Sequence, residues 1–166
     1  GVGSQPTATG PRMHIEYREG RAMKVFTMGF TKKNAQQFFG RLKQPGLKRL
    51  VDVRLNNVSQ LAGFAKRDDL AFFLKAVNGM DYIHLPELAP NKELLDESRK
   101  PGSLWADYER TFLSLMQARH VQDQVSKDVI DGGCLLCSES TPEQCHRRLV
   151  AEYLQAKWGD LEIVHL

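Results

Sequence analysis

Short apolar runs alternate with amphipathic segments along most of the chain. The strand-like apolar runs cover residues 24–28, 50–53, 82–85, 134–137 and 161–165. Segments with apolar residues three to four positions apart lie between these runs, at residues 31–42, 68–77, 104–119, 121–130 and 142–157. This order is typical of strands and helices that alternate around a mostly parallel sheet. It predicts an α/β protein.

The length and the composition favour one domain. A chain of 166 residues suits a single core, and 42% hydrophobic residues are enough to pack it. We expect a single-domain α/β fold with a mostly parallel sheet and helices on both faces, a three-layer arrangement that is Rossmann-like or flavodoxin-like. Residues 1–12 are small and polar and are interpreted as a tag, linker or disordered arm, so the domain is predicted to cover residues 13–166. Residues 13–17 alternate apolar and polar side chains and could form an N-terminal hairpin with residues 24–28.

Several helix ends and two long loops are expected from turn-forming residues. Thr31 is the expected N-cap of the first helix, which ends before Pro45 and Gly46. Residues 55–67 and 87–103 are predicted to be long loops, and loops of this length in a compact domain are usually functional or disordered.

Charge and cysteine content narrow the function classes. The 23 Lys and Arg residues against 20 Asp and Glu leave a net charge of +3, which is too small to indicate nucleic-acid or anionic-membrane binding. No apolar run approaches the ~20 residues that span a bilayer, so we expect a cytoplasmic protein without a membrane partner. Three cysteines argue against a disulfide framework and leave thiol chemistry, metal binding or core packing.

Polar side chains follow four of the predicted strands at their carboxyl ends, where open parallel sheets bind ligands. These candidates are Thr27 and Gly29, Asp52 and Arg54, His84, and Cys137 with Ser138 and Glu139. Each has an ordinary structural alternative: Asp52 could cap a loop, His84 could be a satisfied core histidine, and Arg54 could pair with a surface carboxylate. Taken together, they predict a shared site at one edge of the sheet.

The last predicted helix adds three candidates. Its start is expected at Thr141 as N-cap and Pro142 as the first helical residue, with Gln144 completing a capping box. Cys145, His146 and Arg147 then lie at the end of the first turn. Unpaired N–H groups and the helix dipole favour an anion there and stabilise a thiolate over a thiol.

Two alternatives stay open at this helix end. A phosphate, carboxylate or sulfate ion could bind over it, with Arg147 or Arg54 making a bidentate contact. Cys145 could equally be a small core residue, since it stands four positions before Leu149. Cys134 is expected to be packing, and Arg148 is expected to pair with Glu152 on the helix surface.

Two chemistries could use these residues. In a thiol mechanism Cys145 is the nucleophile, His84 or His146 is the base, and Glu139 is a further catalytic candidate. The anion-binding candidates are Arg54, Arg147, Thr27, Gly29, Asp52 and Ser138. In a metal site the ligands are Cys137, Cys145 and His146, although Cys-x7-Cys-His lacks the paired C-x2-C spacing of structural zinc sites.

Four motifs in the chain resemble the domain of unknown function 488 family of bacterial and archaeal proteins. They are Thr27-Met-Gly29, Asp52-Val-Arg54, Tyr82-Ile-His84-Leu-Pro86-Glu-Leu88, and Cys137-Ser-Glu139 followed by Cys145-His146-Arg147. The resemblance covers about residues 23–158 and implies a compact α/β domain. It implies no activity, because the family has none that is settled.

The leading hypothesis is an enzyme that binds an anionic small molecule, phosphorylated or nucleotide-like, at the carboxyl edge of the sheet. A thiol-dependent transferase or hydrolase is the expected reaction class, and no cofactor is implied beyond a phosphate or sulfate ion. The first alternative is a non-catalytic module that binds nucleic acid or protein with the same edge. The second alternative is the Cys/His metal site. The pattern does not predict an oligomeric state.

Overall fold

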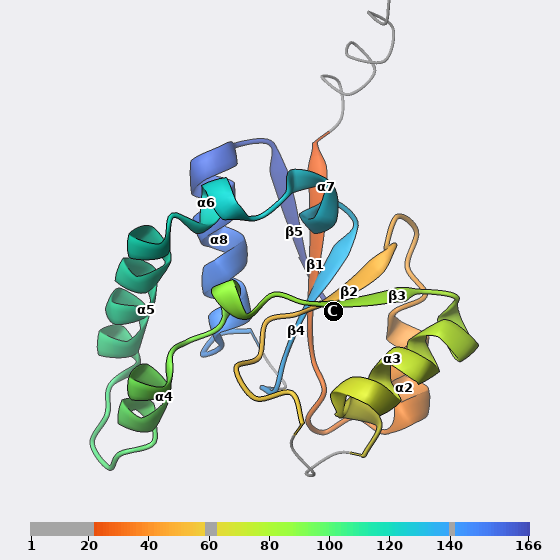
Figure 1. Cartoon of the computed structure of the whole chain (residues 1–166), viewed down its shortest axis with the longest axis horizontal. Helices are drawn as coiled ribbons and strands as arrows, with labels where there is room; N and C mark the ends of the chain where they lie inside the picture. The colour runs from red at the N-terminus through yellow and green to blue at the C-terminus, as the bar shows by residue number, and fades with distance from the viewer. Residues whose placement is uncertain (1–21, 59–62, 140–141) are drawn as a thin grey trace, which may run out of the picture.

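In the part of the chain that the structure describes, five parallel strands form one sheet at the centre of the molecule (Figure 1). The computed structural model describes residues 22–58, 63–139 and 142–166, so the hairpin strand expected at 13–17 and the N-cap expected at position 141 lie outside the described residues. The strand order is β3-β2-β4-β1-β5. The strands are β1 (Met23–Gly29), β2 (Arg49–Asp52), β3 (Asp81–His84), β4 (Gly133–Cys137) and β5 (Leu161–His165).

Helices cover both faces of the sheet, which confirms the predicted α/β fold (Figure 1). One face carries α2 (Ala35–Arg41), α3 (Arg67–Phe73) and the π-helical turn η2 (Leu74–Asn78). The other face carries α4 (Lys92–Ser98), α5 (Trp105–Arg119), α6 (Val121–Gln124), α7 (Lys127–Ile130) and α8 (His146–Trp158). The 3-10 turns are η1 (Gly63–Ala65) and η3 (Pro86–Leu88). None of the helices in the described part of the chain is long and apolar enough to cross a membrane.

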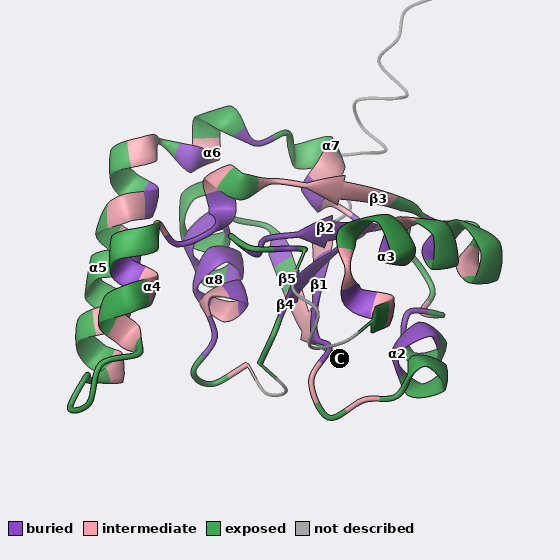
Figure 2. Cartoon of the chain, turned by 60° about the horizontal axis from the view of Figure 1, so that its bottom comes forward, coloured by how far each residue is buried: buried purple, intermediate pink, exposed green. Residues whose placement is uncertain are grey.

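Side chains of the buried strands alternate between two apolar cores, one on each face. The central strands β1, β2 and β4 are largely buried (Figure 2). In β4, Cys134 and Leu136 pack into the core under α2 and α3, with Phe38. Leu135 and Cys137 point the other way, into the core under α5 and α8. Cys134 and Cys137 are therefore on opposite faces of the sheet.

The predicted loop at 87–103 is wrong, because it contains η3 and α4. The Asn91 side chain caps α4 by accepting a hydrogen bond of 2.8 Å from the Leu94 N–H. Leu94 is the buried residue of this helix, so the segment carries no apolar periodicity. The helix predicted at 121–130 is also divided in two, since Val125 is extended and Ser126 caps α7.

Two predicted helix starts are displaced. The N-cap of α2 is Asn34, which forms a capping box with Gln37, whereas the Thr31 hydroxyl donates to the Ser138 carbonyl at 2.6 Å. The last helix begins at His146 rather than at position 142. A turn closed by the Cys145 N–H on the Pro142 carbonyl precedes it, at 3.3 Å.

Candidate functional site

A cleft of about 530 Å³ opens at the carboxyl ends of β2 and β4. The chain leaves β2 toward α3 on one face and leaves β4 toward α8 on the other, and such a divergence opens a crevice at the strand ends. The cleft is bounded by these strand ends, by α4 and α5, and by the start of α8. The predicted site residues that line it are Arg54, Cys137, Ser138, Glu139, Cys145 and His146.

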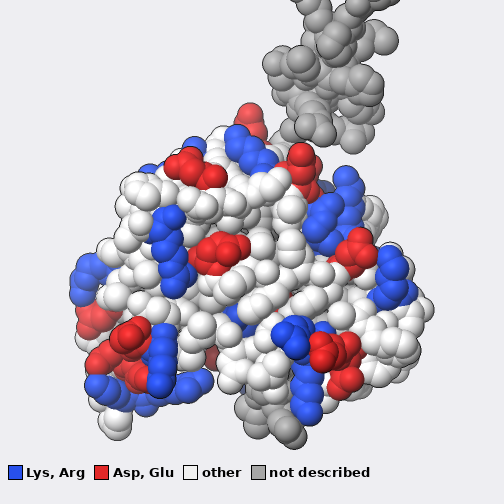
Figure 3. All heavy atoms as spheres, viewed as in Figure 1, with Lys and Arg blue, Asp and Glu red and all other residues white. Residues whose placement is uncertain are grey.

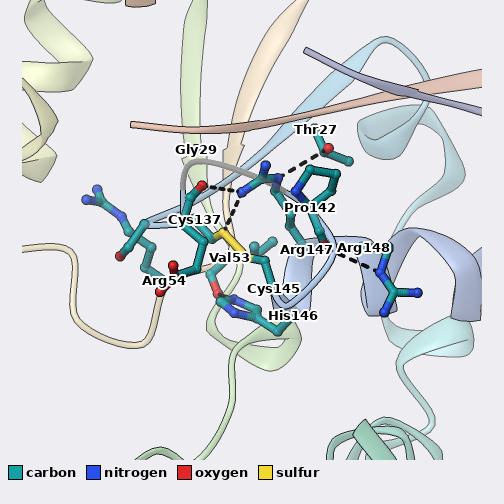
Figure 4. Close-up of a disulfide and its surroundings, with 12 residues drawn as sticks. Thr27, Gly29, Val53, Arg54, Cys137, Pro142, Cys145, His146, Arg147 and Arg148 are labelled. Carbon is teal, nitrogen blue, oxygen red and sulfur yellow. Dashed lines mark hydrogen bonds between the residues drawn. A yellow bond between two sulfur atoms is a disulfide. The ribbon is translucent and has the colours of Figure 1, made fainter. Parts of the chain in front are cut away.

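A disulfide joins Cys137 and Cys145 at the cleft (Figure 4). It connects the end of β4 to the N-cap of α8, and the two Cα atoms are 7.5 Å apart. The cysteine content argued against a disulfide framework, yet the fold brings together two cysteines whose spacing of eight residues matches no familiar motif. Cys145 carries no free thiol in this form. Cys134 is free and buried on the other face, and burial raises its pKa to about 12.

Arg147 lies directly behind the disulfide and is completely buried. Its Nη1 donates to the Cys137 Sγ at 3.1 Å and to the Glu139 carbonyl at 2.6 Å, and its Nε donates to the Thr27 hydroxyl at 3.3 Å (Figure 4). Within the described residues, its Nη2 is buried without a hydrogen-bond partner. Burial lowers the pKa of the guanidinium, since the charged form is poorly solvated there.

Thr27 accepts from this guanidinium and Gly29 leaves room beside it, and neither residue lines the cleft. A Cβ on Gly29 would lie 1.5 Å from the Glu139 carbonyl oxygen and 2.9 Å from Arg147 Nη1. Only a glycine therefore lets the loop after β4 cross the end of β1. The Thr27 hydroxyl also contacts His165 Nδ1 at 2.5 Å, which ties Arg147 to the β5 edge.

Asp52 and Arg54 form a buried ion pair. Arg54 donates through Nε to Oδ1 and through Nη2 to Oδ2 of Asp52, both at 2.8 Å. The Tyr82 hydroxyl donates to the same carboxylate at 2.5 Å, and Arg54 Nη2 also donates to the Ala65 carbonyl. Burial and the hydrogen bond to Asp52 raise the pKa of Tyr82. The charge of Arg54 is thus neutralised inside the protein, and Asp52 does not line the cleft.

The two predicted bases occupy different places. His84 Nε2 contacts the Arg54 carbonyl at 2.8 Å, and the ring does not line the cleft. His146 lines the cleft and contacts the Val53 carbonyl through Nε2 at 2.7 Å. Burial lowers the pKa of His146 to about 4, so the imidazole is neutral at physiological pH. Because a carbonyl only accepts, Nε2 carries the hydrogen and Nδ1 keeps a lone pair.

The sequence pattern did not predict that residues of α4 and α5 form the outer wall of the cleft. Trp105 and Tyr108 line it with stacked rings whose centroids are 5.1 Å apart, and Arg99 and Ser98 contribute from the end of α4. The spacing of the two aromatic residues on α5 is the same as that of core residues, and α4 was predicted to be loop. The prediction for Arg148 is confirmed, since it pairs with Glu152 at 3.0 Å.

A family model described as "Domain of unknown function DUF488" matches residues 34–154. This confirms the resemblance derived from the motifs, and the match carries no activity. No curated protein and no solved structure shows significant similarity to the chain.

Proposed function

We propose, from the premise that the chain belongs to the DUF488 family, that it is a thiol-dependent enzyme acting on an anionic small molecule in the cleft. Cys137 is the reacting sulfur, and Cys145 is its partner in the oxidised, resting form. One observation carries the proposal: the buried Arg147 guanidinium donates to the Cys137 Sγ at 3.1 Å. The sequence favoured Cys145 as the nucleophile, whereas the contact with Arg147 favours Cys137.

The charge of Arg147 favours a thiolate at Cys137 once the disulfide is reduced. A buried cation is unfavourable unless its charge is balanced. The hydrogen bonds of Arg147 go to a hydroxyl, a carbonyl and a sulfur, while the Glu139 and Glu143 carboxylates act on it through their charge. A thiolate at Cys137 supplies the opposite charge at contact distance. Since the thiolate is the nucleophilic form of cysteine, the same contact activates the sulfur.

The walls of the cleft support a ligand with an anionic and an apolar part. Arg99 is exposed at the rim, and the start of α8 lies at the cleft, which Gln144 and Cys145 line. The Trp105 and Tyr108 rings supply an apolar part of the cleft wall. His146, neutral and next to Cys145, is available as the base of such a reaction.

The nucleic-acid alternative has less support. On the face that Figure 3 shows, Lys and Arg side chains are interspersed with Asp and Glu and form no continuous basic surface. The location in the cytoplasm stays a prediction. It fits the proposal, because disulfides in that compartment are usually catalytic or redox-sensing rather than structural.

Alkylation of the reduced chain at neutral pH tests the proposal. We expect Cys137 to react with iodoacetamide at least about tenfold faster than an unperturbed peptide thiol, which is only a few per cent ionised at this pH. Iodoacetate is an anion, so the ratio of its alkylation rate to that of iodoacetamide should be higher at Cys137 than in the peptide. Mass spectrometry measures each cysteine separately, so Cys134, which does not line the cleft, serves as a slow internal reference.

Arg147→Lys and Arg148→Lys form the matched pair of variants. Arg147→Lys should slow Cys137 toward the peptide rate, because an ammonium group cannot make the three contacts of the guanidinium. Arg148→Lys changes a partly buried residue of the same helix that pairs with Glu152 and donates to the Pro142 and Glu143 carbonyls but contacts neither sulfur, so it should leave the rate unchanged. A wild-type Cys137 that reacts no faster than the peptide thiol would contradict the proposal, whatever the stability of the variants.

A further inference from the structure

We infer that the reduced chain binds one zinc-like divalent ion through Cys137, Cys145 and His146. The two sulfur atoms and one ring nitrogen of these residues lie within 4.8 Å of one another. Two thiolates and an imidazole are ligands that Zn²⁺ prefers, and three protein ligands with an open fourth position are typical of catalytic zinc sites. The inference concerns the sulfurs of the proposed reaction but does not rest on it, since binding is measured without a substrate.

The backbone holds the two cysteines at a separation that suits a metal pair. Their Cα atoms are 7.5 Å apart, whereas most disulfides span about 4.4–6.8 Å. Two sulfurs on one tetrahedral zinc ion, with Zn–S bonds of about 2.3 Å, lie roughly 3.8 Å apart. After reduction, rotation of the side chains alone can therefore bring the sulfurs to that spacing.

Residues next to the three ligands orient them, as residues that hydrogen-bond to metal ligands do in known metal sites. The Val53 carbonyl accepts from His146 Nε2 at 2.7 Å, which fixes the ring and leaves Nδ1 as the nitrogen with a lone pair. Arg147 donates to the Cys137 Sγ and favours its ionised form. Two thiolates also balance the charge of a divalent ion, so binding removes the repulsion between them.

The fourth position lies on the cleft side, because all three ligands line the cleft. A water molecule or the anionic part of a ligand can occupy it. Reduction by a phosphine breaks the S–S bond with two electrons from phosphorus, and one water supplies the two protons of the thiols and the oxygen of the phosphine oxide. Ion binding then releases the remaining thiol protons to water.

Cobalt(II) added to the reduced chain without oxygen is the direct probe. We expect one ion per chain, with the intense visible bands of tetrahedral cobalt and a thiolate-to-cobalt charge-transfer band, and its displacement by Zn²⁺. Cys145→Ser and the oxidised chain should lose this signal, and Cys134→Ser should keep it. A fully reduced chain that gives no such bands, or bands that persist in Cys145→Ser, would overturn the inference.

Protection from alkylation separates this inference from the proposed function. With a chelator present, the rate at Cys137 reports on the thiolate alone. In a second sample without chelator, one equivalent of Zn²⁺ should slow alkylation of Cys137 at least tenfold, because a bound sulfur is a poor nucleophile. An unchanged rate would contradict metal binding while leaving the proposed reaction intact, and a slow rate with chelator would contradict the reaction while leaving the cobalt result to decide the metal site.

Discussion

Replacing Asp52 with Asn should lower the free energy of unfolding by about 3–5 kcal/mol. Asp52 is fully buried and Arg54 is 4% exposed, so the variant leaves a cation inside the protein without its counter-charge. The Tyr82 hydroxyl also loses its charged acceptor. Urea unfolding followed by circular dichroism measures the difference.

An exposed ion pair at the start of β3 provides the control. Lys75 and Asp81 lie 3.0 Å apart with both side chains largely in solvent. Asp81→Asn should change the unfolding free energy by less than about 1 kcal/mol. If Asp52→Asn had an effect as small as this, the buried pair would not organise the second strand end as described.

Replacing Gly29 with Ala should lower the free energy of unfolding by about 3 kcal/mol, at the upper end of the usual overpacking range. The added Cβ would overlap the Glu139 carbonyl oxygen, which must move and thereby give up its hydrogen bond from Arg147. Because Arg147 also holds the Cys137 sulfur, the variant should slow alkylation of reduced Cys137. Urea unfolding and the alkylation rate report on the two effects independently.

Gly40→Ala is the matched control for this substitution. Gly40 lies in α2, and nothing is within 4 Å of a Cβ placed there. Alanine should stabilise this exposed helical position by about 0.5–1 kcal/mol. If Gly29→Ala and Gly40→Ala had the same effect on the free energy of unfolding, the loop after β4 would not depend on passing close to Gly29.

The fold was largely predictable because its strands are buried and its longer helices are amphipathic. Alternation of short apolar runs with helical spacing located all five described strands, and α5 has the period of a helix packed on one face. The short helix α4 was missed because an Asn91 cap and one buried leucine stabilise it, rather than a periodic apolar face. Local hydrogen bonds of this kind leave no pattern in a hydropathy profile.

The site was predictable as a meeting of strand ends but not in its pairings. Parallel strands bring their carboxyl ends to one edge, so Arg54, Cys137 and Cys145 were expected to meet, and they do. Which charge is satisfied depends on side-chain geometry: Arg54 folds back two residues onto Asp52, while Arg147 reaches a sulfur. Tertiary packing determines the partner of each arginine, so neither sequence spacing nor residue type predicts it.

The ultraviolet absorbance of the reduced, metal-free chain tests most directly whether Cys137 is a thiolate next to Arg147. At neutral pH we predict the absorbance of one thiolate, lost in Cys137→Ser and retained in both Cys145→Ser and Cys134→Ser. Acidification should remove it, since it protonates the sulfur that Arg147 contacts. A chain that shows no thiolate absorbance until the pH approaches ~8.5, the range of ordinary cysteines, would contradict a sulfur activated by the buried guanidinium.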